Sequence, residues 1–307
     1  MPTRRSQGML GLFRSHKKFV TTVGNDFIMK MDPPADTVAK LRMNGTTARS
    51  VGELKMPALM VEPHPLAVKD AVLLHMHGGA YVSGGILQCR SLISPICAAA
   101  GVRALTFCYR LAPQYPYPAQ LEDAYRAYRY LRECGYGADQ IAFVGESAGG
   151  NLALSLALRL REEGEKMPAA IALLSPWVDL AQTGDSYQAL QSVDATLDGA
   201  ELKQCAIQFS GGEERLLDPR ISPVYADFSG FPPVQIHCGT NEILLSDSEK
   251  LELKLLRCGV KAQLLRWVGM CHVFQAFGFE ESRASNRQIG LFLKKQLMQK
   301  NGGFANP

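Results

Sequence analysis

The stretch that decides the fold is Ile141-Ala-Phe-Val-Gly-Glu-Ser-Ala-Gly-Gly150, followed by Asn151-Leu-Ala-Leu154. Its pattern predicts a short apolar strand, a turn of small residues and a long apolar helix. A serine in Gly-x-Ser-x-Gly, where a strand changes into a helix, is typical of a nucleophile elbow. Such a turn forces strained backbone angles on Ser147, and Gly145 and Gly149 remove the Cβ atoms that would collide there. The positive end of the helix would then lie beside the exposed hydroxyl.

The pentapeptide alone fits equally well a tight strand-to-helix turn with an incidental serine. A serine hydroxyl is almost entirely protonated at neutral pH, so a nucleophilic serine needs a base, and the base needs an acid that orients it. The rest of the chain therefore decides between the two interpretations.

Composition sets the class of protein. The chain has 307 residues, 47% of them hydrophobic and 20% charged, which is typical of a soluble globular protein of one large or two small domains. A net charge of +4 gives no nucleic-acid footprint. We find no run of eighteen apolar residues, no signal-peptide pattern and no phosphate-binding glycine motif, so we expect no transmembrane helix, no secretion and no nucleotide cofactor.

The eight cysteines are scattered, without a Cys-x-x-Cys pair. We expect reduced thiols and a cytoplasmic protein; a disulfide-bearing secreted protein is the alternative.

Apolar strands alternate with helical patterns along the chain. Strands are predicted at residues 54–62, 71–76, 102–109, 141–145, 169–174, 232–238 and 261–268. Helices are predicted at residues 91–100, 120–134, 199–209 and 285–299, after the elbow, and in a segment that ends at Arg257. This alternation predicts an α/β fold with a mostly parallel central sheet and helices on both faces.

The first forty residues carry Arg4, Arg5, Arg14, Lys17 and Lys18 among apolar residues at loosely helical spacing. An amphipathic helix on a membrane surface is one interpretation. We favour a helix that packs its apolar side on the domain, because the segment is short and its pattern imperfect.

Functional groups of open α/β sheets gather at the carboxyl ends of the strands. The candidate base is His272, the one histidine that follows the last strand in a loop; the others are His16, His64, His75, His77 and His237. Glu242, shortly after the preceding strand, is the preferred acid. Asp247 is the alternative, although its place in the first turn of a helix indicates a structural role. The order Ser147, acid, His272 is that of an α/β-hydrolase triad.

The glycine-rich loop His77-Gly-Gly-Ala80 can turn backbone N–H groups toward an incoming group. An oxyanion hole needs two or three converging N–H groups, and we assign Gly78, Gly79 and Ala148 to it. His75 and His77 share one face of a strand, but no Cys, Asp or Glu near them in the sequence completes a metal site, so we expect neither metal nor cofactor.

Several motifs together resemble the hormone-sensitive-lipase-like esterases of the α/β-hydrolase fold. His77-Gly-Gly-Ala80 is similar to that family's oxyanion motif, and Gly145-Glu-Ser-Ala-Gly-Gly-Asn151 to its nucleophile motif. Tyr109-Arg-Leu-Ala-Pro113, Ser175-Pro-Trp-Val-Asp-Leu180 and Asp218-Pro-Arg-Ile-Ser-Pro223 also fit, so the resemblance covers about residues 70 to 275. The chain departs from the family's usual pattern at Ala80, where a third glycine is common, and at Glu242, where most members have Asp.

The resemblance also implies a cap over the catalytic domain. Residues 1–45 and 185–217 match its two parts, residues 46–184 and 218–300 the catalytic domain, and residues 301–307 are a tail. On this interpretation the apolar N-terminal residues line or gate an acyl pocket.

We therefore predict a carboxylic ester hydrolase for short- to medium-chain acyl esters, with Ser147, His272 and Glu242 as the triad. An amidase or a lactonase with the same triad is the alternative among enzymes. A small-ligand receptor is the alternative among binding proteins, although an intact His272 counts against it. Expected partners are a small-molecule ester and, as one arrangement, a second copy of the chain; nucleic acid and stable membrane insertion are not expected.

Overall fold

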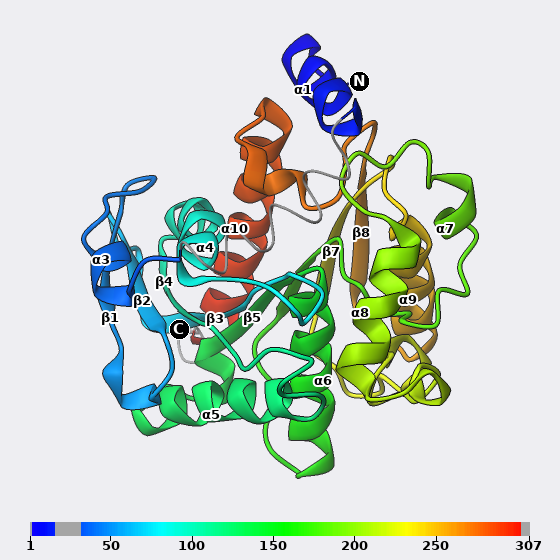
Figure 1. Cartoon of the computed structure of the whole chain (residues 1–307). Coiled ribbons are helices and arrows are strands. Elements are labelled where there is room, and N and C mark those ends of the chain that lie inside the picture. Colours follow the sequence, from blue (N-terminus) through cyan, green and yellow to red (C-terminus); the bar gives the residue numbers. More distant parts are fainter. Residues whose placement is uncertain (1, 16–31, 302–307) are drawn as a thin grey trace.

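A central sheet of eight strands organises the computed structural model, which describes residues 2–15 and 32–301 (Figure 1). The strand order is β1-β2-β4-β3-β5-β6-β7-β8. β2 pairs antiparallel with both β1 and β4, and all other pairs are parallel. The strands are β1 Thr46–Ser50, β2 Ala58–Pro63, β3 Val68–Met76, β4 Val102–Phe107, β5 Ile141–Glu146, β6 Ile171–Leu174, β7 Val234–Gly239 and β8 Ala262–Trp267. The predicted α/β fold with a mostly parallel sheet is confirmed.

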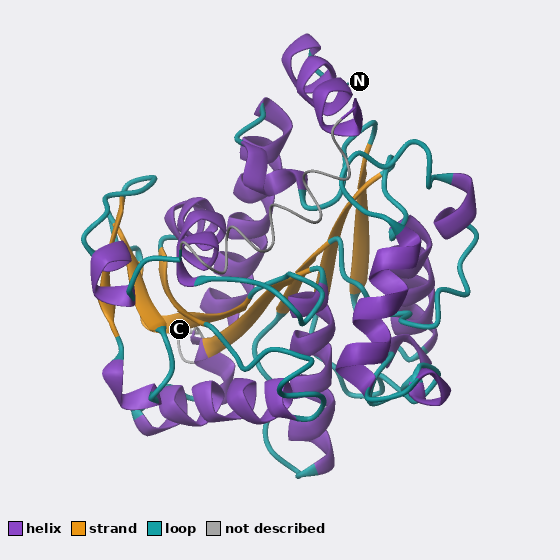
Figure 2. Ribbon diagram, viewed as in Figure 1, coloured by secondary structure: helices purple, strands orange, loops and turns teal. Residues whose placement is uncertain are grey.

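Helices cover both faces of this sheet (Figure 2). α4 (Ile86–Ala100) and α10 (Glu280–Asn301) pack on the face to which Leu73 contributes. α5 (Ala119–Glu133), α6 (Ala148–Glu162) and α9 (Leu245–Arg257) pack on the face to which Leu74 contributes. Successive strand residues point to opposite faces, so a strand covered on both sides must be apolar at every position. This is why the inner strands are continuous apolar runs in the sequence.

Several boundaries differ from the sequence prediction, among them the start of α10 at Glu280 instead of residue 285, and two of the differences depend on segments outside the predicted element. α4 begins at Ile86, five residues before the predicted residue 91, because the Asp32 carboxylate accepts the N–H groups of Ile86 and Leu87 at 2.7 and 3.1 Å. The predicted strand at 54–62 begins only after Pro57; before it lies a 3-10 turn, η2 (Gly52–Leu54), and β1, which we did not predict, pairs with the strand. In the first case the helix cap comes from a residue far away in the chain, where a local pattern cannot show it.

The N-terminal helix α1 (Arg4–Ser15) lies at the top of the view in Figure 1, and it contacts the domain through Leu10 on its apolar side, as the favoured interpretation predicted. Leu10 is only 3% exposed and lies in an apolar cluster with Ala195, Met270 and Phe274. The backbone N–H of Thr3 donates to Glu281 at 2.6 Å. Within the described ranges, no helix is long and apolar enough to cross a membrane. The rest of the N-terminal segment, residues 16–31 with His16, and the tail from residue 302 lie outside the described residues.

Residues 185–217 leave the sheet between β6 and β7, as expected. They form α7 (Ser186–Ala189), α8 (Gly199–Ser210) and the 3-10 turn η4 (Glu213–Arg215). The remaining short elements are α3 (Ala35–Ala39), η3 (Ala138–Gln140), η5 (Pro223–Tyr225) and η6 (Phe274–Phe277). The loops after β3, β5, β7 and β8 all leave carboxyl ends of parallel strands and therefore meet at one edge of the sheet.

Candidate active site

Ser147 occupies the turn between β5 and α6 with φ 54° and ψ −122°, angles that L-residues rarely adopt. A Cβ atom on Gly145 would lie 2.2 Å from the Gly149 carbonyl oxygen, and one on Gly149 would lie 2.0 Å from that of Met76. Both contacts are with backbone, which cannot move aside. The strained serine and the need for glycine on either side of it, both predicted from the sequence, are confirmed.

His272 and Glu242 meet at the carboxyl ends of β8 and β7. The Nδ1 atom of His272 lies 2.7 Å from Oε2 of Glu242. Glu242 is fully buried and His272 is 8% exposed. A carboxylate only accepts hydrogen bonds, so Nδ1 carries the ring proton and Nε2 of the neutral imidazole keeps its lone pair. The ring is thus set up to accept a proton at Nε2.

Three further groups hold the Glu242 carboxylate in place. Its Oε1 atom accepts from the Gly239 N–H at 2.8 Å, from Ser175 Oγ at 2.9 Å and from Cys238 Sγ at 2.6 Å. Ser175 Oγ in turn accepts from the N–H of Val273 at 3.1 Å. One hydroxyl therefore ties the carboxylate to the backbone of the loop that carries His272.

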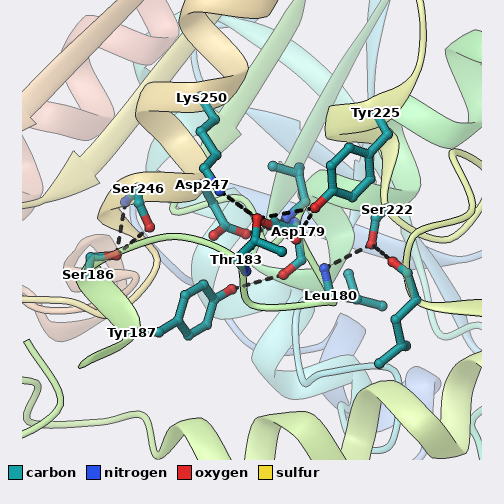
Figure 3. A network of polar contacts seen from close by, with 12 residues as sticks. Asp179, Leu180, Thr183, Ser186, Tyr187, Ser222, Tyr225, Ser246, Asp247 and Lys250 are labelled. Atoms are coloured by element: carbon teal, nitrogen blue, oxygen red, sulfur yellow. Dashed lines mark hydrogen bonds and ion pairs between the residues drawn. The ribbon is translucent and has the colours of Figure 1, made fainter. Parts of the chain in front are cut away.

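Asp247 takes no part in this contact. It lies in the first turn of α9, fully buried, and its Oδ2 accepts from the N–H groups of Val178 and Asp179 at 2.9 and 2.8 Å. Figure 3 shows it within a polar network in which Asp179 binds Lys250 Nζ at 3.0 Å and Tyr225 OH at 2.9 Å. Burial and the nearby charge of Asp179 raise the pKa of Asp247 well above its ordinary value. Asp247 thus fixes the segment after β6.

The oxyanion assignment needs one correction. The Gly78 N–H donates to Oε1 of Glu146 at 2.7 Å and is not available to a ligand. Gly79 and Ala80 follow with φ 111° and 52°, and no described residue accepts a hydrogen bond from the N–H of either. Ala148 is the first residue of α6, where a helix N–H has no partner within the helix. The sequence showed which loop is rich in glycine but not which of its N–H groups is free.

Glu146, which sequence reasoning left without a role, connects two parts of the site. Besides Gly78, it contacts Nε2 of His75 at 2.8 Å through Oε2, and Nδ1 of His75 lies 2.7 Å from the Thr106 hydroxyl. All three side chains are buried. The only sequence signal was a charged residue at the end of an apolar strand, where a buried charge needs a hydrogen-bonding partner.

The structure also places the other histidines of the sheet. His75 is taken up by Glu146 and Thr106, so it forms no pair with His77 for a metal. Cys89 and Cys108, distant from His77 in the chain, lie beside it in space. His237 points into the structure, as expected for a strand residue: its Nδ1 atom lies 2.8 Å from Ser285 Oγ and 3.1 Å from Trp267 Nε1.

Ser147 and His272 line one cavity of about 360 Å³. Gly79, Ala80 and Glu146 lie in its wall. Apolar side chains from three parts of the chain complete the wall: Leu92, Leu197, Leu202, Val273, Ala276 and Phe277. An apolar cavity with a few converging polar groups is the usual form of a small-molecule site.

Comparison with known proteins identifies the family of this chain. A family model described as alpha/beta hydrolase fold matches residues 73–276. An acetyl-hydrolase of Streptomyces hygroscopicus is 36% identical over 75% of this chain and 77% of its own length. An esterase of Acinetobacter venetianus is 33% identical over 72% of this chain and 74% of its own length.

Solved structures give the same result over nearly the whole chain. A crystal structure of an esterase from the bacterial hormone-sensitive lipase family has 32% identity and a TM-score of 0.84, and covers 97% of this chain and 99% of that one. EstE5 soaked with p-nitrophenyl butyrate has 32% identity and a TM-score of 0.86, with coverage of 96% and 99%. The chain therefore belongs to the hormone-sensitive-lipase family of esterases, within the α/β-hydrolase fold.

Proposed function

We propose that this esterase hydrolyses carboxylic esters through Ser147, His272 and Glu242 as a catalytic triad. The observation that carries the proposal is the 2.7 Å contact between Glu242 and Nδ1 of His272 at the cavity that Ser147 also lines. Glu242 holds the ring so that Nε2 accepts the Ser147 proton while Oγ attacks the ester carbonyl. His272 then returns the proton to the leaving alcohol. Water, activated in the same way, hydrolyses the acyl-enzyme and frees the acid.

The negative oxygen of each tetrahedral intermediate would be held by the N–H groups of Gly79, Ala80 and Ala148. Gly78 does not contact the oxygen itself; its hydrogen bond to Glu146 fixes the peptide that precedes these donors. Preorganised backbone donors of this kind commonly contribute about 10²- to 10³-fold each to turnover.

We propose short- to medium-chain acyl esters as substrates. A cavity of about 360 Å³ with an apolar wall favours a small acyl group. Among the relatives are an acetyl-hydrolase and an ethyl acetate hydrolase of Pseudomonas putida, the latter 31% identical over 69% of this chain and 68% of its own length. Leu197 and Leu202 come from the second proposed cap segment, which supports a cap that borders the acyl site.

The remaining expectations are proposals of the same kind. The cap comprises residues 1–45 and 185–217, and residues 46–184 and 218–300 form the catalytic domain. The eight free cysteines are compatible with a reducing compartment, and we propose a cytoplasmic location. The proposed partner of the site is a small-molecule ester; a second copy of the chain is an arrangement that ultracentrifugation can test.

The decisive experiment is Ser147→Ala assayed on p-nitrophenyl acetate and butyrate. Turnover should fall to the uncatalysed background, because Ser147 is the only nucleophile in the proposed mechanism. Ser155→Ala, on the same helix, is the matched control and should keep turnover. Hydrolysis by Ser147→Ala above background would refute the assignment. A serine-directed phosphonate should label the wild type once per chain and the variant not at all; absence of labelling in the wild type would favour a binding protein.

Two substrate comparisons define the finer specificity. An ester and an amide of the same acyl group separate an esterase from an amidase, and we expect the ester to react faster. A series of p-nitrophenyl esters from acetate to laurate gives the acyl preference, for which we expect a maximum at short chains. Faster hydrolysis of laurate than of butyrate would contradict the proposed substrate class.

A further inference from the structure

Two neighbouring strands and one helix bring an imidazole and two thiols together. β3 and β4 pair in parallel with Met76 beside Phe107, so the next residues, His77 and Cys108, also lie side by side. Cys89 is in the first turns of α4, and its Sγ lies 3.9 Å from the Phe107 carbonyl oxygen. One ligand atom of each of His77, Cys89 and Cys108 lies within 4.8 Å of the other two.

The His77 ring is already held in one orientation. Its Nδ1 atom lies 2.6 Å from the Gly78 carbonyl oxygen, which only accepts, so Nδ1 carries the proton. The ring stacks on Tyr109 with 4.0 Å between centroids. Nε2 is therefore the atom with the lone pair, and it is buried without a hydrogen-bond partner among the described residues. A buried acceptor without a partner requires an explanation, and a histidine whose other nitrogen donates to a carbonyl is typical of a metal ligand.

Burial has the largest effect on the titration of the His77 and Cys89 side chains. Burial lowers the pKa of His77 to about 4 from its ordinary 6.5, against a smaller raising effect of the Glu146 carboxylate, so the ring is neutral and Nε2 keeps its lone pair. Burial raises the pKa of the Cys89 thiol well above its ordinary value, and the neighbouring Cys108 adds to this as a smaller cause. Cys108 is partly exposed and gives access from solvent.

We propose that His77, Cys89 and Cys108 bind one thiophilic cation, Zn²⁺ or Cu⁺. One imidazole and two thiolates are the ligands that these cations prefer, whereas Mg²⁺ and Ca²⁺ need oxygen ligands, none of which belongs to this set. On binding, the two thiols release their protons to solvent and form two metal–sulfur bonds, while Nε2 supplies the third bond without losing a proton. Zn²⁺ keeps one position for water, and Cu⁺ takes the three ligands alone.

The site lies beside the loop that contains Gly79 and Ala80, because His77 directly precedes it. A bound cation would fix the ring of His77 and with it the start of this loop. The proposal does not depend on ester hydrolysis, since its primary readout is the metal itself.

Zinc is the probe for the test. The full chain is reduced with a phosphine, freed of metal with a chelator, incubated with excess Zn²⁺ and separated from free ion by gel filtration. We expect one zinc per chain for the wild type and for Cys134→Ser, the control at an exposed cysteine. The double variant Cys89→Ser/Cys108→Ser should retain less than a tenth of this. With Cd²⁺, the ultraviolet thiolate-to-metal absorption should appear in the wild type and be missing in the double variant.

Two results would overturn the proposal. The first is a wild type that binds no zinc after this treatment. The second is a double variant that binds as much zinc as the wild type, which would place the ion on other groups. Circular dichroism checks that the double variant is folded. If it is not, Cys108→Ser alone, at the partly exposed ligand, should weaken zinc binding at least tenfold, and unchanged affinity would again refute the site.

Discussion

Glu146→Ala tests whether the carboxylate beside Ser147 holds the oxyanion loop. The substitution removes the acceptor of two bonds, from the Gly78 N–H at 2.7 Å and from His75 Nε2 at 2.8 Å. Both donors are buried and would be left without partners. A hydrogen bond to a charged group contributes about 1.5–3 kcal/mol, so the two bonds together amount to about 3–6 kcal/mol. We expect the lower end, because water can enter the space that the shortened side chain leaves.

The same substitution should reduce turnover more than substrate binding. Loss of the Gly78 bond frees the peptide that precedes Gly79 and Ala80, and a displacement of about 1 Å in a catalytic group can cost about 10²-fold. We therefore expect kcat on p-nitrophenyl butyrate to fall about 10²-fold with a smaller change in KM. Urea unfolding followed by tryptophan fluorescence measures the stability of the same preparations.

Glu146→Gln is the matched control. The amide oxygen can still accept from Gly78, and the amide NH₂ can donate to Nε2 of His75 if the ring changes tautomer and donates from Nδ1 to Thr106. We expect this variant to unfold within about 1 kcal/mol of the wild type, since neither buried group loses its partner. An Ala variant with wild-type stability and kcat would refute the reasoning.

Three further outcomes follow from single side chains. Burial lowers the pKa of His237 to about 3 from its ordinary 6.5, so below pH 6.5 the unfolded chain binds a proton that the folded chain excludes. The free energy of unfolding should therefore fall by about 1.4 kcal/mol for each pH unit between pH 6.5 and pH 3. His237→Asn should remove that slope in urea unfolding at stepped pH. Gly149→Ala should destabilise by about 3 kcal/mol, because its Cβ would lie 2.0 Å from a backbone carbonyl oxygen, whereas Gly52→Ala, with open space, should change little; equal unfolding midpoints would contradict this. The pKa of Asp247 is raised in the folded chain, so this carboxyl ionises first in the unfolded chain and stability falls as pH rises above 3.8. Asp247→Asn should therefore be at least as stable as the wild type at pH 8, with unchanged kcat, whereas Glu242→Gln should lose kcat. Loss of kcat in Asp247→Asn but not in Glu242→Gln would exchange the two roles.

Much of the fold could be predicted from local patterns in the sequence. The apolar runs of the inner strands, the alternation with amphipathic helices and the Gly-x-Ser-x-Gly turn each follow from short-range rules of periodicity and sterics. The start of α4 did not, because its cap is the carboxylate of Asp32, far away in the chain. β1 is short and alternates in exposure, so it gives a weak signal by itself.

The candidate site, too, has parts that the sequence predicts and parts that only the tertiary structure shows. From the sequence alone came the strained serine, the loop of His272 and the two candidate acids that follow β7. Which acid contacts His272 depended on where the start of α9 lies relative to β6: Asp247 turns to the N–H groups of Val178 and Asp179, and Glu242 to the ring. Chain order places both acids near the base but cannot orient either one.

What the sequence by itself determined is chemistry that depends on neighbours in the chain: the elbow, the parallel sheet and the loops that carry functional groups. Only the tertiary structure decided contacts between groups far apart in the chain. The Gly78 N–H donates to Glu146, and Cys89 and Cys108 lie close to His77, because β3 pairs with β4 and β5 in one register. Hydrogen bonds and metal sites are set by distances of a few ångströms, and those distances exist only once the strands are paired.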